Sequence, residues 1–424
     1  MNLAERVGEL AREYVTVYES PDPENVYVYS PGIAVLPNGR LVATLDMSGP
    51  GIDGIAGEKR RIEGGKLWFG KVFVSDDKGR TWQHRTDFPF MHARPFTAGR
   101  SLYVLGHCHD LAIIRSDDGG DTWSEPVLLT QGQMWHQAPA NVMYAKGNVY
   151  LVMEWNVRSD GAGWPVSDLA PVLLRGRADA DLTDRSNWTF ASELAFCEAV
   201  PEEELDYFGV PFYKVEPGTS ALVAPGRKCA RMGWLETNVV RFDDPDHYFH
   251  DPEGNTFHLW MRSHTGGTGY AAIAKAVELE DGTIETKLEK SPSGKTFALI
   301  PCPGGHLKFH ITFDERCGLY WLLSSQATDS MTRAERLPED RYGLGKNERH
   351  RLQLHFSRNC VDWCFAGLVA VGDTPRQARH YASMAIDGED LVILSRSGDG
   401  RAKDAHNGNL ITFHRIANFR RLIY

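Results

Sequence analysis

Short apolar segments of four to eight residues recur along the whole chain, and tight polar turns separate them. Typical turns read Pro-Asn-Gly at 37–39, Asp-Pro-Glu-Gly-Asn at 251–255 and Ile-Asp-Gly-Glu-Asp at 386–390. Strands bounded by Gly, Asn and Asp in this way are typical of all-β proteins. A helical period is visible only at the start of the chain. The pattern therefore predicts an all-β fold preceded by one short helix over residues 1–14.

The apolar segments form six groups of four strands within a single domain that spans residues 1–424. Residues 15–19, Val-Thr-Val-Tyr-Glu, belong to none of these groups, and we expect them to pair into the last one. Residues 198–237 are predicted to be an irregular insertion, which could hide a seventh group. The six groups begin near Gly32, Phe96, Asn141, Asn238, Phe309 and Ser383.

One polar turn is repeated. It reads Ser-Asp-Asp-Lys-Gly-Arg-Thr-Trp at 75–82 and Ser-Asp-Asp-Gly-Gly-Asp-Thr-Trp at 116–123, and a worn copy runs from Ser357 to Trp363. Each copy lies between two apolar β-type runs, so it predicts a hairpin in which Asp or Asn caps its own backbone and Gly takes a positive φ. The turn resembles the Asp-box of sialidase-type β-propellers. This resemblance implies a six-bladed, possibly seven-bladed β-propeller with the box between the third and fourth strands of a blade.

In such a propeller, turns of one parity share the face of the boxes, and turns of the other parity share the ligand-binding face. His, Arg, Tyr and Trp gather in turns of the second kind, which suits an acidic sugar. Arginine forks bind carboxylates, aromatic rings stack on sugars, and His or Tyr can move protons. The residues that we assign to this face for catalysis or substrate binding are Arg94, His107, His109, Trp135, His136, Tyr213, Arg231, Glu236, Arg262, His264, Arg379 and Tyr381.

A first chemistry is β-elimination at a uronic acid, which needs a base, an acid and a positive group near the carboxylate. The segments LYVLGHCHDLAIIRSDDGGDTW, MWHQAP and LWMRSHTGG resemble the propeller families of ulvan lyases and of rhamnose-glucuronate lyases and rhamnosidases. The resemblance implies a polysaccharide or oligosaccharide lyase and assigns roles by position. His107 or His109 with His136 would serve as base and neutraliser, Tyr213 would be the acid, and Arg231 or Arg262 would anchor the carboxylate.

A second chemistry is hydrolysis by a sialidase-like exo-glycosidase. The segment HYASMAIDGEDLVIL resembles the sialidase stretch that carries the tyrosine nucleophile, which would be Tyr381. Glu236 with Arg262 would support it, and Arg351 would be the third arginine of the carboxylate clamp. Sialidases carry their first arginine in an Arg-Ile-Pro segment, where this chain has Ser30 and Pro31. Because that arginine is missing, elimination is the preferred prediction.

For the proton donor of this hydrolysis, the sequence offers Asp46 or Asp53. A third hypothesis is a non-catalytic propeller that binds glycans through tryptophans such as Trp135, Trp155 and Trp234.

Charge and composition narrow the partners. A formal net charge of -10 argues against a nucleic-acid partner, and no apolar run approaches the roughly 20 residues of a membrane span. No signal peptide is visible, so we expect a cytoplasmic protein, or a periplasmic or secreted one if a leader was removed. The chemistry requires no cofactor. Cys302, His306 and His264 are candidates for a structural zinc or calcium ion.

Overall fold

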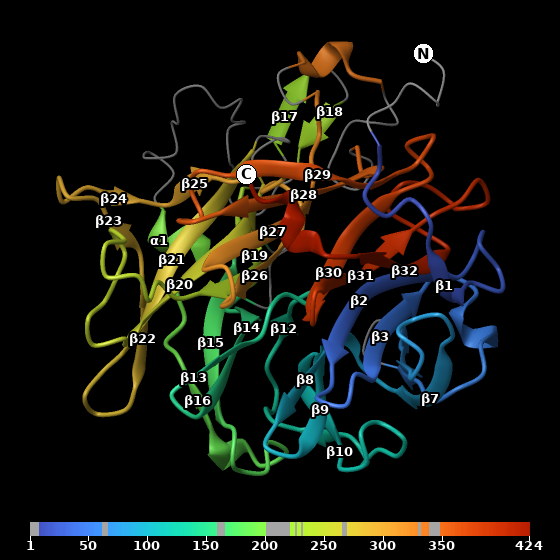
Figure 1. The fold of residues 1–424 in the computed structure, drawn as a ribbon, viewed down its shortest axis with the longest axis horizontal. Coiled ribbons are helices and arrows are strands. Elements are labelled where there is room, and N and C mark those ends of the chain that lie inside the picture. The colour runs from blue at the N-terminus through green and yellow to red at the C-terminus, as the bar shows by residue number, and fades with distance from the viewer. Residues whose placement is uncertain are drawn as a thin grey trace.

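Six antiparallel sheets of four or five strands follow one another along the chain and form the blades of a β-propeller. The computed structural model describes residues 8–61, 67–158, 166–200, 221–224, 227–229, 232–264, 269–329, 332–338 and 348–424. In Figure 1 the chain colour runs around the molecule in blade order, from blue through green and yellow to red, with β2, β8, β26 and β30 nearest its middle. The fold predicted from the repeated turns is confirmed.

Each blade is built outward from an innermost strand. The first three blades comprise β2 (Tyr27–Val35), β3 (Leu41–Ser48), β6 (Gly70–Ser75) and β7 (Gln83–Phe88); β8 (Met91–Ala98), β9 (Ser101–Cys108), β10 (Asp110–Ser116) and β11 (Val127–Leu128); and β12 (Trp135–His136) with β13 (Met143–Ala145), β14 (Asn148–Asn156), β15 (Leu169–Arg177) and β16 (Trp188–Phe190). The last three comprise β19 (Trp234–Val240), β20 (Thr256–Ser263), β21 (Tyr270–Glu278) and β22 (Ile284–Lys287), with β25 (Leu299–Pro301) beside β21; β26 (His310–Asp314), β27 (Leu319–Ser325), β28 (Arg351–Ser357) and β29 (Cys364–Val371); and β30 (Arg379–Asp387), β31 (Asp390–Ser397) and β32 (Leu410–Ile416).

Short elements lie outside these ladders. Three small hairpins are β4 (Arg60–Arg61) with β5 (Leu67–Trp68), β17 (Ala221–Ala224) with β18 (Arg227–Cys229), and β23 (Glu289–Lys290) with β24 (Thr296–Phe297). The helices among the described residues are α1 (Phe196–Ala199), η2 (Ile52–Gly54), η3 (Arg185–Asn187), η5 (Ala334–Arg336) and η8 (Phe419–Leu422). None of the helices described is long and apolar enough to cross a membrane. The predicted insertion over 198–237 ends earlier than expected, because Trp234 already begins the innermost strand of the fourth blade.

The N-terminal segment closes the ring, as predicted. Strand β1 (Val15–Glu19) pairs antiparallel with β32 and becomes the outermost strand of the sixth blade. The helix predicted over 1–14 is wrong for residues 8–14, which form a turn and extended chain. The amides of Leu10 and Ala11 donate to the carbonyl oxygens of Leu368 and Val369 in β29, at 2.7 and 2.9 Å. These amides, which would bond within a helix, thus bond to the free edge of the fifth blade instead.

The repeated turns join the third and fourth strands of the first, second and fifth blades. In the second copy, Ser116 Oγ accepts the amide of Gly120 at 2.8 Å, and Asp118 accepts the amide and the hydroxyl of Thr122 at 2.9 and 2.6 Å. The first copy repeats these bonds through Ser75 and Asp77. Because side chains satisfy the backbone of these turns, they act as rigid hairpin corners.

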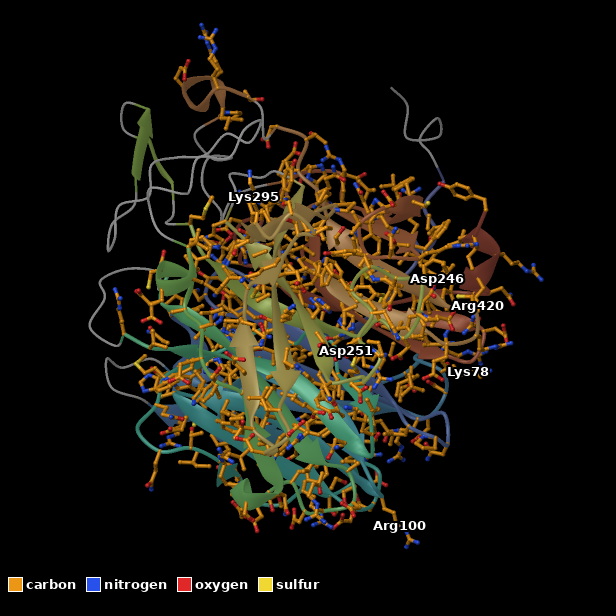
Figure 2. The ribbon with its side chains drawn as sticks, turned by 90° about the vertical axis from the view of Figure 1, so that its left-hand side faces the viewer. Lys78, Arg100, Asp246, Asp251, Lys295 and Arg420 are labelled. Carbon is orange, nitrogen blue, oxygen red and sulfur yellow. The ribbon has the colours of Figure 1, made fainter. Side chains whose placement is uncertain are left out.

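The two faces of the propeller can be followed in Figure 2. Lys78 and Asp246, which lie in turns of the parity of the repeated turns, and Arg420, which follows the last strand, are on the right of the view, whereas Lys295, in a connection between two blades, is at the upper left. Turns of the parity of the repeated turns therefore share one face of the propeller, and the connection between blades lies on the other, as expected from the sequence.

A ring of buried polar side chains joins neighbouring blades near the propeller axis. Each binds the main chain of the following blade, so the inner edges of the blades find hydrogen-bond partners and the spacing between blades is fixed. In blade order, the six contacts are Thr44 Oγ1 to Ala93 O (2.6 Å), Arg94 Nη1 to Asn141 O (3.1 Å), Asn141 Nδ2 to Val239 O (2.7 Å), Asn238 Nδ2 to Phe309 O (3.2 Å), Lys308 Nζ to Ala382 O, and Ser383 Oγ to Pro31 O (2.7 Å).

Candidate active site

Four innermost strands begin with the same irregularity. The pairing register of β2, β8, β19 and β30 with its neighbour shifts close to the start of the strand, as in a β-bulge. One residue in each shift adopts the left-handed conformation, which costs a non-glycine residue about 1 to 3 kcal/mol and concentrates at functional sites. The four residues are Ser30 (φ 45°), His92 (φ 54°), Glu236 (φ 58°) and Tyr381 (φ 48°).

Two of these residues, Glu236 and Tyr381, meet through an arginine of the second strand of the fourth blade. Arg262 Nη1 donates to Glu236 Oε2 at 3.1 Å and also to the hydroxyl oxygen of Tyr381. Arg262 Nε donates to the main-chain oxygen of His306 at 3.0 Å, which fixes the plane of the guanidinium. Burial raises the pKa of Tyr381, and the arginines beside it partly offset that effect. The phenol is therefore neutral, with a carboxylate and a guanidinium at its oxygen.

Two more guanidinium groups lie against the ring of Tyr381. The central guanidinium carbon of Arg396 is 5.1 Å from the ring centroid, that of Arg349 is 5.6 Å away, and that of Arg262 is 5.8 Å away. At most 3% of the surface of any of these three residues is exposed. Burial and the neighbouring arginines lower the pKa of Arg349 to about 10, so it remains charged at neutral pH. Three buried cations thus surround a single tyrosine.

Asp46, near the end of β3, is a second buried carboxyl group of the site. It is completely buried, and burial raises its pKa to about 7 although Arg396, the amide of His92 and the hydroxyl of Ser30 act in the opposite direction. Neither of its oxygens makes a hydrogen bond of good geometry within the described part of the chain. Asp46 can therefore carry a proton near neutral pH, which is the property of a general acid.

A histidine cluster occupies the rim beside Asp46. His92 Nδ1 and His107 Nε2 are 2.8 Å apart, and the ring of His136 lies 5.1 and 6.0 Å from theirs, centroid to centroid. Burial lowers the pKa of both His92 and His107 well below the usual value, so these imidazoles are neutral. His107 and His136 were expected here. His109 lies outside this cluster, and its ring centroid is 6.0 Å from that of Trp68.

Several residues expected at the site lie elsewhere. Arg94 is buried between blades, where its Nη atoms donate to the main-chain oxygens of Asn141 and Val152. Arg379 donates to the carbonyl oxygens of Ala378 and Gly398 and lies over Tyr14. These two arginines therefore bind main chain and do not belong to the cluster around Tyr381.

Trp135 also serves the fold. It is 5% exposed, stacks on Trp155 and bonds to Gln133. Tyr213 and Arg231 lie outside the described residues. In the described part of the chain, no group of three or more His, Cys, Asp or Glu could hold a metal ion. The hypothesis of a metal at the buried residues Cys302, His306 and His264 therefore gains no support.

Arg349 was missed, and Arg351 was assigned in its place. Arg351 binds Glu348 at 3.1 Å, and its side chain is 27% exposed. The chain reads Glu-Arg-His-Arg from 348 to 351, and residues two apart on an extended chain point to the same side. The sequence therefore placed an arginine of this segment on the side that faces the site. Which of the two reaches Tyr381 depends on where β28 begins.

No protein-family model and no curated protein sequence matches the chain. Solved structures match it in fold. A protein of unknown function from Dyadobacter fermentans has a TM-score of 0.51 at 13% identity, covering 96% of this chain and 98% of that one. The Hadza microbial sialidase Hz136 has a TM-score of 0.53 at 14% identity, covering 96% and 68%.

Trypanosoma rangeli sialidase has a TM-score of 0.52 at 12% identity, covering 97% of this chain and 60% of its own. This chain thus spans less than two thirds of the trypanosomal enzyme. At these identities the likeness establishes a shared fold, the sialidase-like β-propeller.

Proposed function

We propose that the protein is a glycoside hydrolase that acts on a sugar bearing a carboxylate, with Tyr381 as nucleophile, Glu236 as its base and Asp46 as general acid. One observation carries this proposal: Arg262 bonds at once to the Tyr381 hydroxyl and to Glu236. A tyrosine nucleophile is a known exception to the two-carboxylate rule of glycosidases, and sialidases use it. The geometry thus favours hydrolysis over the elimination that the sequence suggested first.

The charge balance of the site supports an anionic substrate. Arg262, Arg349 and Arg396 bring three positive charges, whereas Glu236 brings one negative charge and Asp46, with a pKa of about 7, is only partly ionised near pH 7. Buried charges require partners, and guanidinium groups pair best with carboxylates. Arg396 comes from the sixth blade and lies 4.1 Å from the ring of Tyr29, beside the place where the first arginine of sialidases is missing. Arg396 thus supplies the third guanidinium group, because Ser30 stands where sialidases carry their first arginine.

The first chemical step uses the neutral phenol. Its oxygen attacks the anomeric carbon, and the proton passes to Glu236 as the new bond to carbon forms. The bond between that carbon and the leaving oxygen breaks, and Asp46 gives its proton to the leaving oxygen. Arg262 stabilises the negative charge that develops on the tyrosine oxygen.

The second step reverses these roles. Asp46 takes a proton from water, the water oxygen attacks the anomeric carbon, and the tyrosine oxygen leaves and regains its proton from Glu236. Two displacements retain the configuration of the sugar.

The test is hydrolysis of 4-methylumbelliferyl glycosides of sialic acid and of glucuronic acid. Tyr381→Phe removes only the attacking oxygen, so we expect kcat/KM to fall by about 10³-fold or more. Tyr248→Phe is the matched control, because Tyr248 is 61% exposed and away from the site. If Tyr381→Phe released methylumbelliferone as fast as the wild type, the tyrosine mechanism would be wrong.

The histidine cluster favours a second candidate function, elimination at a uronic acid. Three imidazoles in contact, two of them held neutral by burial, could take the proton next to the uronate carboxylate while the arginines hold that carboxylate. The unsaturated product would absorb in the ultraviolet. Elimination is favoured if His136→Ala abolishes this absorbance change in uronate oligosaccharides while Tyr381→Phe leaves it intact.

A further inference from the structure

The four left-handed residues share a second feature, which concerns the residue that follows each of them. In every case a buried side chain of the preceding blade bonds to the main chain of that next residue. The four contacts are Ser383 Oγ to Pro31 O (2.7 Å), Thr44 Oγ1 to Ala93 O (2.6 Å), Thr237 N to Glu154 Oε1 (3.0 Å) and Lys308 Nζ to Ala382 O. Each strained conformation is therefore held from outside its own strand.

Lys308 is the anchor beside Tyr381. Its ammonium nitrogen donates to the main-chain oxygen of Ala382 and, at 3.1 Å, to Ser383 Oγ. The side chain is 2% exposed, and the charged groups that act on it are Glu236 and Arg94. Burial lowers the pKa of this amine to about 7, so the buried lysine opposes the stability of the fold rather than adding to it. A residue of this kind calls for a role other than packing.

Glu154 is the corresponding anchor beside Glu236. It is fully buried, and its Oε1 accepts the amide of Thr237 at 3.0 Å and the hydroxyl of Thr237 at 2.8 Å. Gln137 Nε2 donates to the main-chain oxygen of Thr237 at 3.3 Å. Both main-chain polar groups of the residue after Glu236 are therefore bonded to the third blade.

We propose that Lys308 and Glu154 are positioning residues that hold Tyr381 and Glu236 in the left-handed conformation required for catalysis. The proposal rests on the proposed function, since it assigns these anchors to the nucleophile and its base. Without an anchor, a residue at positive φ relaxes towards the β region and turns its side chain away from the axis. A displacement of about 1 Å between reacting groups lowers the rate by about 10²-fold.

Lys308→Met keeps the length of the side chain and removes the amine. On 4-methylumbelliferyl glycosides, we expect kcat to fall by about 10²-fold while KM changes by less than about 3-fold. The melting temperature should change little, because removal of the buried amine offsets the loss of its two hydrogen bonds. A residue needed only for structure would give the opposite result, a lower melting temperature with an unchanged kcat per folded molecule. That result would overturn the proposal.

The matched control is another contact of the axial ring. Asn141 bonds to Val239, which lies three residues beyond Glu236 in the regular ladder with Leu259. Asn141→Ala removes two hydrogen bonds, so it should lower the melting temperature and leave kcat per folded molecule within about 3-fold of the wild type.

Glu154 allows a rescue by a conservative change. The amide oxygen of Glu154→Gln can still accept both hydrogen bonds of Thr237, whereas Glu154→Leu cannot. We expect Glu154→Gln to keep most of the wild-type kcat and Glu154→Leu to lose about 10²-fold. Equal activity of the two variants would count against an anchor at this position.

Crystal structures of Lys308→Met and Glu154→Leu separate this proposal from the proposed function. The positioning role requires that residue 381 or residue 236, respectively, leave positive φ. If the wild type hydrolyses neither glycoside but these shifts occur, the proposed function fails and the anchors stand. If both residues stay left-handed in the variants, the anchors fail whatever the enzyme hydrolyses.

Discussion

Asp118, in the turn between β10 and β11, and Asp46, at the end of β3, are the same residue type in opposite surroundings. Asp118 is exposed and accepts hydrogen bonds from Ser116, Asp121 and Thr122, which hold its pKa far below the ordinary value. Asp46 is fully buried, takes no hydrogen bond of good geometry from the described residues, and has its pKa raised to about 7.

The contrast separates the two faces of the propeller by their chemistry. A carboxylate whose oxygens are all occupied by its own turn stabilises that turn and has no capacity left for a substrate. A buried carboxyl group that the fold leaves without such bonds destabilises the molecule and can exchange a proton near neutral pH. The arginines differ in a similar way, because Arg349 lies buried against the ring of Tyr381 and near two other arginines, whereas Arg351 is partly exposed and paired with Glu348.

Asp46→Asn tests the role of the buried carboxyl group and has the largest expected effect. Loss of the general acid should lower kcat by about 10² to 10⁴-fold on a substrate with a poor leaving group. The pKa of Asp46 is about 7 in the fold and 3.8 in its absence, so the folded wild type binds this proton more tightly and loses stability as pH rises from 4 to 7.

Asn does not titrate, so the variant should gain up to about 4 kcal/mol over the wild type above pH 7. The two proteins should differ little in this respect below pH 4. Chemical denaturation at pH 4 and pH 8 measures this change. Parallel pH profiles for the two proteins would show that Asp46 is not buried as described.

Two variants at positions two residues apart test the difference between the buried and the partly exposed arginine. Arg349→Leu removes a guanidinium beside Tyr381, and we expect KM for an acidic glycoside to rise about 10 to 100-fold, as for loss of a charge-assisted hydrogen bond. Arg351→Leu removes only the pairing with Glu348, a partly exposed contact. Its KM should stay within about 2-fold of the wild type. Steady-state kinetics in which the two variants lost affinity equally would refute this assignment.

Asp118→Ala tests the structural side of the comparison and has the smallest expected effect. It removes the acceptor for the turn, so the free energy of unfolding should fall by about 1 to 2 kcal/mol. The activity per folded molecule should not change, because the turn lies on the face opposite Tyr381. The loss should shrink in strong acid, where the pKa of Asp118 is crossed and the wild type also loses these bonds. A change in KM would contradict the separation of the faces.

Much of this architecture could be predicted from local signals. The hairpin turns and the alternation of apolar runs are properties of short stretches, so the blades and the closing strand followed from the sequence. Tyr381, Glu236 and Arg262 were assigned to one site because their segments resemble those of known propellers, and Arg262 does bond to the other two.

Features that depend on geometry across blades could not be predicted. The left-handed residues are set by contacts from the preceding blade, and the choice between Arg349 and Arg351 depends on where β28 starts. The helix expected over 1–14 is wrong for residues 8–14, because Leu10 and Ala11 bond to β29, about 350 positions away in the chain, which no local propensity can reveal.

The pairing of β1 with β32 also sets a schedule for folding. The sixth blade cannot be completed until residues 410–416 have been made, although its outermost strand, 15–19, is synthesised long before them. At about 5 to 20 residues per second, the Val-Thr-Val-Tyr-Glu strand waits roughly 20 to 80 s with both edges open. During that interval it is an exposed β edge that can pair with another chain. Ring closure therefore makes protection of this strand during synthesis more important than the size of the protein alone would suggest, and slower synthesis lengthens the exposure.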